Sequence, residues 1–198
     1  MSLTTAVPLV LQDPGFLFWA PLLTAEPAHV AAGSTYDADV WTAAWISMGA
    51  TENGSKVSSE IQVEPVYAAE FADPLRWSTI TRKGSLGFAM LNFTLNNLKR
   101  AYNGGTIATV SGTGATLSSS LVGPTPGQEV RAMLGWESLD HTVRFIAYQT
   151  LNGGAVEVSN VKQPALAVIP CMFNFEVPSG APNTPIKWYA AGTARLGT

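Results

Sequence analysis

Asp140 and His141 are the neighbouring residues of this sequence whose types most directly suggest catalysis. A histidine oriented by a carboxylate can act as the general base for a serine or cysteine nucleophile. The chain, however, contains no Gly-x-Ser-x-Gly nucleophile elbow, and Asp140–His141 falls in an expected turn between two strands. We interpret the pair as a solvated turn, and an esterase-like enzyme with a nucleophile near His141 stays as an alternative.

The other residue types that carry chemistry are too sparse or too far apart to form a site. Cys171, the sole cysteine, lies in an apolar run that indicates a buried, inert thiol and excludes a disulfide. Glu60 and Glu64 would lie about 13 Å apart on one strand, whereas glycosidase carboxylates lie within roughly 5–9.5 Å. No phosphate-binding loop, dinucleotide fingerprint or metal-ligand spacing occurs. The sequence therefore predicts no catalytic, metal-binding or cofactor-binding residues, and a protein that is not an enzyme.

The composition is low in charge. Charged residues make up 13% of the 198, about half the roughly 25% of ordinary soluble domains. We therefore expect much of the surface to meet other protein, as in an oligomer, with a monomer rich in Ser, Thr and Gly as the alternative. The net charge of −3 provides no basic field for stable nucleic-acid binding. No apolar run reaches the about 20 residues of a membrane helix, so we expect no membrane partner.

One stretch of the chain carries a convincing helix signal, and it predicts a short helix over about 94–103. Its expected docking face is an apolar stripe at helical spacing, formed by Leu91, Leu95, Leu98 and Tyr102. Thr94 can cap the start, and Asn103-Gly104 supplies the stop. A helix this short is marginal alone, so it must dock on something. The outer face is expected to turn toward solvent or a neighbouring subunit and carries Asn96, Asn97, Lys99 and Arg100.

Strand and turn patterns fill most of the remaining sequence and predict a mainly β fold. Expected strands cover 40–48, 57–64, 75–82, 86–92, 129–136, 142–149, 166–177 and 186–190. Asn53-Gly54 is a hairpin signal, and Lys83-Gly84 predicts a turn between two strands. A single domain over residues 1–198, built as a β-sandwich with one flanking helix, accounts for this order.

The expected strand at 57–64 alternates most clearly between apolar and polar residues. Val57, Ile61 and Val63 share one face. The opposite face carries Ser58, Glu60, Gln62 and Glu64. This pattern predicts a half-buried strand with one polar, acidic face.

Two segments depart from the regular pattern. Residues 1–27 contain four prolines and the apolar run FLFWAPLL, which predicts an extended N-terminal arm with edge strands. Residues 104–127 carry no charge and are rich in Gly, Ser and Thr, which predicts a long loop or hairpin. Both segments must pack on the domain or on a neighbour.

In their order along the chain, these features resemble the major tail tube proteins of long-tailed bacteriophages with non-contractile tails. The resemblance rests on the Gly-rich turn at 49–54, the strand pair after it, FAMLNFTLNNLKRAYNGG at 88–105, RAMLGWES at 131–138, RFIAYQ at 144–149 and IPCMFNFEVPSG at 169–180. It covers about residues 45–190. The Pro-rich start and the uncharged segment at 104–127 depart from the family pattern.

The resemblance implies a β-sandwich or barrel-like subunit that forms hexameric rings stacked into a tail tube, the conduit for DNA ejection. The expected partners are the chain itself, a tape-measure protein inside the tube, tail terminator and distal tail proteins at its ends, and viral DNA only in transit. The expected location is the virion, assembled in the host cytoplasm. The acidic strand face of Ser58, Glu60, Gln62 and Glu64 would line the lumen and repel phosphates. Candidate contacts between subunits are Phe16, Phe18, Trp19, Lys99 and Arg100.

Two further alternatives come from other classes of protein. Six tryptophans are enough for the stacking platform of a carbohydrate-binding β-sandwich. A tube protein of type VI secretion would share the tail tube architecture, and the sequence separates it poorly from the phage form.

Overall fold

The computed structural model describes residues 15–28, 41–67, 71, 73–110, 118–139, 143–158, 167–180 and 182–190. His29, Asp140, His141 and residues 1–14 of the expected arm lie outside these ranges. The elements are β1 (Phe16–Pro21), β2 (Ile46–Ser47), β3 (Thr51–Val66), β4 (Arg76–Met90), α1 (Leu95–Ala101), β5 (Thr106–Val110), β6 (Ser118–Val122), β7 (Ala132–Glu137), β8 (Val143–Asn152), β9 (Ile169–Phe175) and β10 (Ile186–Ala190). The mainly β fold with one short helix is confirmed, and the strand pairings are antiparallel.

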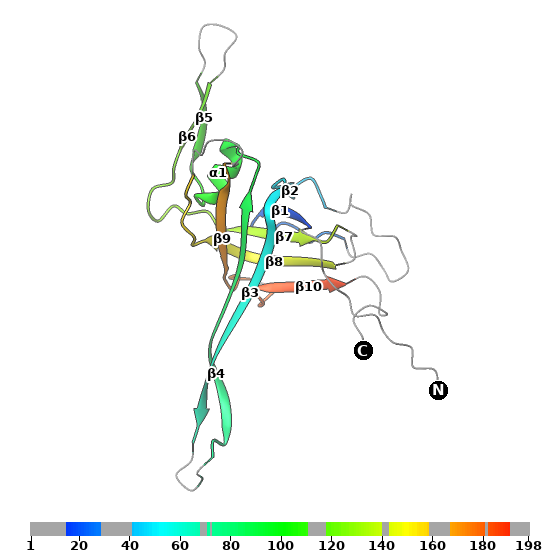
Figure 1. The fold of residues 1–198 in the computed structure, drawn as a ribbon, viewed down its shortest axis with the longest axis vertical. Coiled ribbons are helices and arrows are strands. Elements are labelled where there is room, and N and C mark those ends of the chain that lie inside the picture. The colour runs from blue at the N-terminus through cyan, green and yellow to red at the C-terminus, as the bar shows by residue number, and fades with distance from the viewer. Residues whose placement is uncertain are drawn as a thin grey trace, which may run out of the picture.

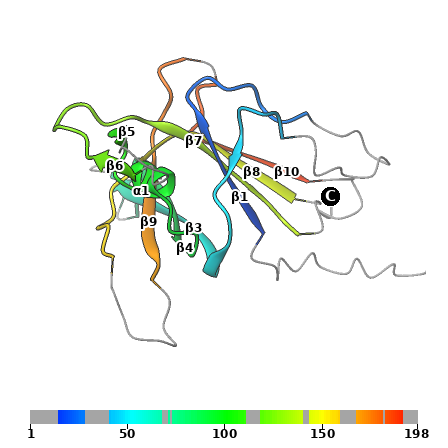
Figure 2. The same cartoon turned by 90° about the horizontal axis from the view of Figure 1, so that it is seen from above.

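A large sheet with the strand order β2-β1-β7-β8-β9-β4-β3 organises the structure. It bends at β8, because the first half of this strand pairs with β10 and its last three residues pair with β9. Figure 2 shows β1, β7, β8 and β10 together, with β9 crossing them at an angle. The bend folds one sheet into two layers, which can then bury a core between them.

The main core lies between these two layers. Leu134 and Phe145 come from the first layer, and Leu86 and Phe173 come from the second. Each of these four side chains is fully or almost fully buried. Apolar residues alternate inward along each strand, so the period of two that predicted the strands also fills the core. The expected strand at 166–177 is confirmed as β9, which lies between β8 and β4.

A second apolar cluster covers the opposite face of the first layer. Trp41 and Trp45 pack there with Met133 and Ile146, and the ring of Trp41 stacks on Phe18 at a centroid distance of 4.1 Å. The strand expected over 40–48 is wrong, since only Ile46–Ser47 pairs with β1 and the residues before it cover this face. Gly135 allows the close approach, because a Cβ there would lie 2.5 Å from the Trp41 ring.

The helix α1 begins and ends where the sequence predicts. The Thr94 hydroxyl accepts a hydrogen bond from the Asn97 N–H at 3.2 Å, as an N-cap does. At the other end, Asn103 adopts a φ of 57°, and the Gly104 N–H donates to the Lys99 carbonyl at 2.9 Å. This pattern is a Schellman motif with asparagine in the left-handed position.

The docking face of the helix differs from the prediction. Leu98 packs on the core, but Tyr102 is 41% exposed, and the most deeply buried helical side chains are Asn97 and Ala101. Asn97, expected on the outer face, donates its amide to the carbonyls of Met48 and Asn92 at 3.2 and 2.9 Å. The helix therefore docks partly through polar bonds, which an apolar stripe in the sequence cannot reveal.

The strands β3 and β4 form one long hairpin, and neither of the predicted glycine turns within it occurs. The predicted turn at Lys83-Gly84 is wrong, because β4 continues through it. A Cβ at Gly84 would lie 2.5 Å from the Phe175 ring, so this glycine serves packing. Asn53-Gly54 is also not a hairpin turn: it lies at a register shift of β3, and Gly54 has a φ of 75°.

The two irregular segments also take definite structures where they are described. Residues 104–127 contain the β5–β6 hairpin, which agrees with the hairpin alternative. The arm expected over 1–27 is wrong for residues 16–21, because β1 lies within the main sheet between β2 and β7. Pro21 is tolerated because it is the last residue of the strand.

Candidate functional site

The outer part of the β3–β4 hairpin projects from the body as a two-stranded arm (Figure 1). Val57 pairs with Leu86 at the body, and Val66 pairs with Arg76 near the tip. Nine residues at a strand rise of roughly 3.3 Å give the arm a length of about 30 Å. Side chains from Ser58 to Glu64 are exposed on both faces. The prediction of a half-buried strand at 57–64 is therefore wrong for the single chain.

One face of the arm is mainly apolar and continues the core side of the sheet, with Arg82 on it opposite Ile61. The register pairs Val63 with Thr79 and Pro65 with Trp77, and paired residues share a face. Ile61, Val63 and Trp77 are 50%, 47% and 63% exposed. These side chains therefore lie on paired strands but stay half-exposed, whereas Leu86 and Phe88, nearer the body on β4, are buried in the core.

The other face of the arm is polar and carries the residues expected to line a lumen. Ser58, Glu60, Gln62 and Glu64 lie on this face and are exposed. The register places Lys83 opposite Glu60, and Arg76 opposite Val66 beside Glu64. These two cations balance the two carboxylates, so the face is not net acidic as expected. The strand pattern alone could not show this, because the charges come from the partner strand. Whether this face lines a channel stays a prediction.

The tip of the arm gathers large apolar side chains that the sequence reasoning did not single out. Tyr67, Phe71 and Leu75 are 62%, 60% and 58% exposed, and Asp73 is exposed among them. Aromatic residues on both sides of the Asp73-Pro74 turn were the available signal, since a turn normally carries small and polar residues.

Of the residues expected at subunit contacts, Trp19, Lys99 and Arg100 lie together beside α1. The Arg100 guanidinium lies over the Trp19 ring, 5.2 Å from its centroid, and donates to the Asn97 side-chain oxygen at 2.6 Å. Burial lowers the pKa of Arg100 from its usual value. Phe16 is exposed and Phe18 is covered by Trp41. Trp19 and Arg100 thus form an ordered surface beside α1, whereas Phe18 packs inside the subunit against Trp41.

A cavity of about 340 Å³ opens at this surface. Its lining comes from β1, β2, α1, β9 and the segments that flank the β5–β6 hairpin, and includes Trp19, Ile46, Lys99, Arg100, Val130 and Phe173. Its walls are mainly apolar, and Lys99 and Arg100 are the charged residues of its lining.

Two polar clusters elsewhere have structural rather than catalytic geometry. The buried carboxylate of Glu137 accepts from the Arg144 guanidinium at 2.8 Å and from the indole of Trp41. Glu26 accepts from Tyr148 at 2.7 Å, from Lys187 at 3.1 Å and from Tyr189. Each acid accepts hydrogen bonds from residues far from it in the sequence, and so holds those segments together.

The groups that could do chemistry are inert or dispersed within the described ranges. Cys171 is buried, as expected, and burial raises the pKa of its thiol to about 12. No cluster of three or more His, Cys, Asp or Glu suited to a metal occurs among the described residues. In the same part of the chain, no helix has the length and apolar character needed to cross a membrane.

Comparison with known proteins adds no identification. No protein-family model matches the chain. The search of curated proteins finds no relative. The arm, the tip and the cavity beside α1 are therefore the features from which a function can be argued.

Proposed function

We propose that this chain is a structural virion protein that assembles into stacked hexameric rings and forms the tail tube of a bacteriophage. The observation that carries the proposal is the β3–β4 arm, which exposes an apolar face in the single chain. The proposed tube conducts viral DNA, encloses a tape-measure protein and meets terminator and distal tail proteins at its ends.

The physics of the arm supports self-assembly. An isolated two-stranded ribbon is marginally stable in water, because one layer of side chains has nothing to pack on. Fully burying an exposed side chain of this size contributes about 1.5–3 kcal/mol, and covering the exposed half of Ile61, Val63 or Trp77 would contribute about half of that for each. An extended, apolar, paired arm is also an aggregation hazard unless a specific partner covers it. A symmetric assembly of identical copies provides such a partner in every subunit.

The charge distribution is consistent with a conduit. The polar face of the arm has a balanced charge, and the whole chain has a net charge of −3. A wall without a positive excess does not retain a phosphate backbone, since counterion release drives that binding. The low charged fraction of 13% agrees with a subunit whose sides and ends meet other copies.

Electron microscopy of the purified chain in negative stain tests the proposal. The expected result is rings or tubes for the wild type and a large loss of assembly for Trp77→Ser. Val63→Ser on the arm and Val177→Ser outside it form a matched pair, because both valines are exposed. Only the arm variant should weaken assembly. A wild-type chain that stays monomeric at high concentration would contradict the proposal.

The exposed aromatic residues also favour a carbohydrate-binding module as the second candidate. Trp77 and Tyr67 are each more than 60% exposed, as a platform that stacks on sugar rings requires. Binding of soluble glycans by the monomer, lost in Trp77→Ser, would favour this candidate over the tube.

A further inference from the structure

The cavity beside α1 combines mainly apolar walls with two cationic side chains. Trp19, Ile46 and Phe173 supply apolar lining, and the cavity volume of about 340 Å³ lies within the range of roughly 300–1,000 Å³ seen for specific binding pockets. Lys99 and Arg100 are the charged residues of the lining. No carboxylate of the described residues forms an ion pair with either. The chemistry that fits this cavity is an aromatic side chain accompanied by a carboxylate.

The tip of the β3–β4 arm offers this combination. Phe71 and Leu75 are exposed, and Asp73 is the charged residue between them in the described part of the tip. Because both strands are paired up to Val66 and Arg76, the tip is presented on a defined base.

The tip lies far from the cavity beside α1. Figure 1 shows α1 on the body and the arm running away from it along the longest axis. The arm extends about 30 Å beyond the body, so its tip cannot fold back to its own cavity without breaking the strand pairing. Two complementary surfaces that lie apart on one subunit produce a head-to-tail contact, which propagates without limit.

We propose that the arm tip of one copy docks in the cavity beside α1 of the next copy. Phe71 enters the apolar cavity, and Asp73 faces Lys99 and Arg100. The contact rests on the proposed self-assembly and identifies the surfaces that would join successive copies along a tube.

Site-directed cross-linking tests the contact directly. Phe71→Cys and Lys99→Cys are made in separate chains, mixed and treated with a short bismaleimide; the native Cys171 is buried and does not compete. The expected product is a covalent dimer in the mixture. Phe71→Cys mixed with Lys187→Cys is the control, because Lys187 lies on β10 outside the cavity, and it should give no dimer.

Charge reversal supplies a second readout. Asp73→Lys and Lys99→Glu should each raise the protein concentration needed for assembly by about tenfold, and the chain that carries both should recover most of the loss. The Phe71→Ser chain keeps an intact cavity, and the Lys99→Glu chain keeps an intact tip. A mixture of the two should therefore form only one such contact between two chains, which sedimentation velocity would show as dimers rather than longer assemblies. Circular dichroism must first show a native fold for each variant.

The outcomes separate this contact from the proposed function. If tubes form but the Phe71→Cys and Lys99→Cys mixture gives no covalent dimer, and if tubes also tolerate both charge reversals, the proposed tip–cavity contact is wrong. The proposal of a tail tube would then still hold. A monomeric wild type would overturn both. A cross-link in the mixture with recovery in the double variant would support the contact. If Lys99→Glu fails to fold, Asp73→Lys and the cross-link decide.

Discussion

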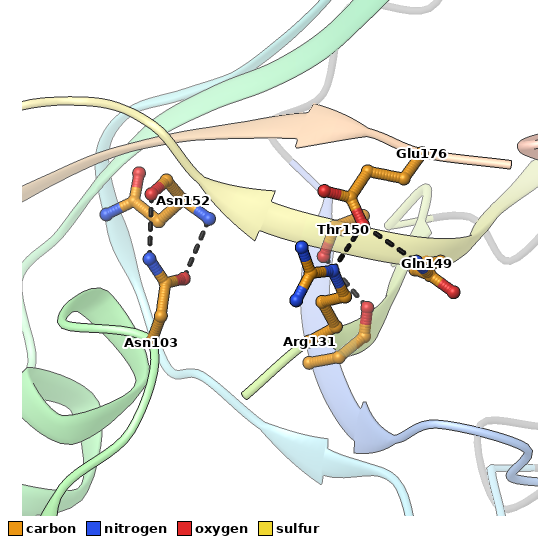
Figure 3. A network of polar contacts seen from close by, with 7 residues as sticks. Asn103, Arg131, Gln149, Thr150, Asn152 and Glu176 are labelled. Carbon is orange, nitrogen blue, oxygen red and sulfur yellow. Dashed lines mark hydrogen bonds and ion pairs between the residues drawn. The ribbon is translucent and has the colours of Figure 1, made fainter. Parts of the chain in front are cut away.

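Asn103 and Asn152 exchange two hydrogen bonds that join the end of α1 to the end of β8. The Asn103 side-chain amide donates to the Asn152 carbonyl at 2.8 Å, and the Asn152 N–H donates to the Asn103 side-chain oxygen at 2.8 Å. Figure 3 shows the pair beside a second group, in which Glu176 accepts from Arg131 and Gln149. Asn103 thus ends the helix through its backbone and fixes the helix on the sheet through its side chain.

Asn103→Ala should destabilise the protein by about 2–4 kcal/mol. The change removes two hydrogen bonds of about 0.5–1.5 kcal/mol each. It also leaves alanine at a φ of 57°, a left-handed conformation that asparagine tolerates better than alanine does. Asn103→Gly restores the backbone preference and should lose less. Urea unfolding followed by tryptophan fluorescence measures both. Equal losses for the two variants would show that the backbone conformation contributes little.

Asn97→Ala and Asn96→Ala form a matched pair on adjacent helical positions. Asn97 is 3% exposed and bonds two carbonyls and Arg100, whereas Asn96 is exposed. We expect Asn97→Ala to cost about 2–3 kcal/mol, since it leaves buried carbonyls without these donors, and Asn96→Ala to cost under about 0.5 kcal/mol. Thermal unfolding gives the comparison. A similar small effect for both would mean that water replaces the Asn97 amide.

The buried pair of Glu137 and Arg144 should show strong coupling. Both side chains are about 1% exposed, and they bond across the β7–β8 strand pair at 2.8 Å. Removing one partner of a buried ion pair typically costs about 3–5 kcal/mol. A double-mutant cycle with Glu137→Gln and Arg144→Met should therefore show that the double variant loses much less than the sum of the single losses. Additive losses would indicate that other donors already compensate Glu137 and other acceptors already compensate Arg144.

Acid should weaken the attachment of Glu26. Burial raises the pKa of Glu26, but hydrogen bonds from Tyr189, Tyr148 and Lys187 outweigh it and leave this pKa below its ordinary value. A lowered folded pKa gives stability that is present above the unfolded pKa and is lost as the pH falls through the folded value. The stability difference between wild type and Glu26→Gln should therefore shrink below about pH 4.5. Chemical unfolding at several pH values measures it, and a constant difference would contradict the assignment.

The sequence by itself determined the features that depend on short-range physics. Thr94 caps the helix and Asn103 stops it, because both act on backbone groups within a few residues. Alternation assigned the central strands, since residues two apart share a face whatever packs on it. The buried Cys171 followed from the apolar run around it.

Only the tertiary structure shows which strand faces are covered, and what Gly84 and Gly135 pack against. The pattern at 57–64 indicates the apolar face, but β3 extends beyond the body, so Ile61 and Val63 stay about half exposed in the single chain. The balanced charge of the polar face depends on Lys83 and Arg76, which pairing brings from a distant part of the sequence. Gly84 resembles a turn signal, yet it makes room for the Phe175 ring, as Gly135 does for the Trp41 ring. These outcomes arise from contacts between residues far apart in the chain, whose register and layer order no local pattern contains.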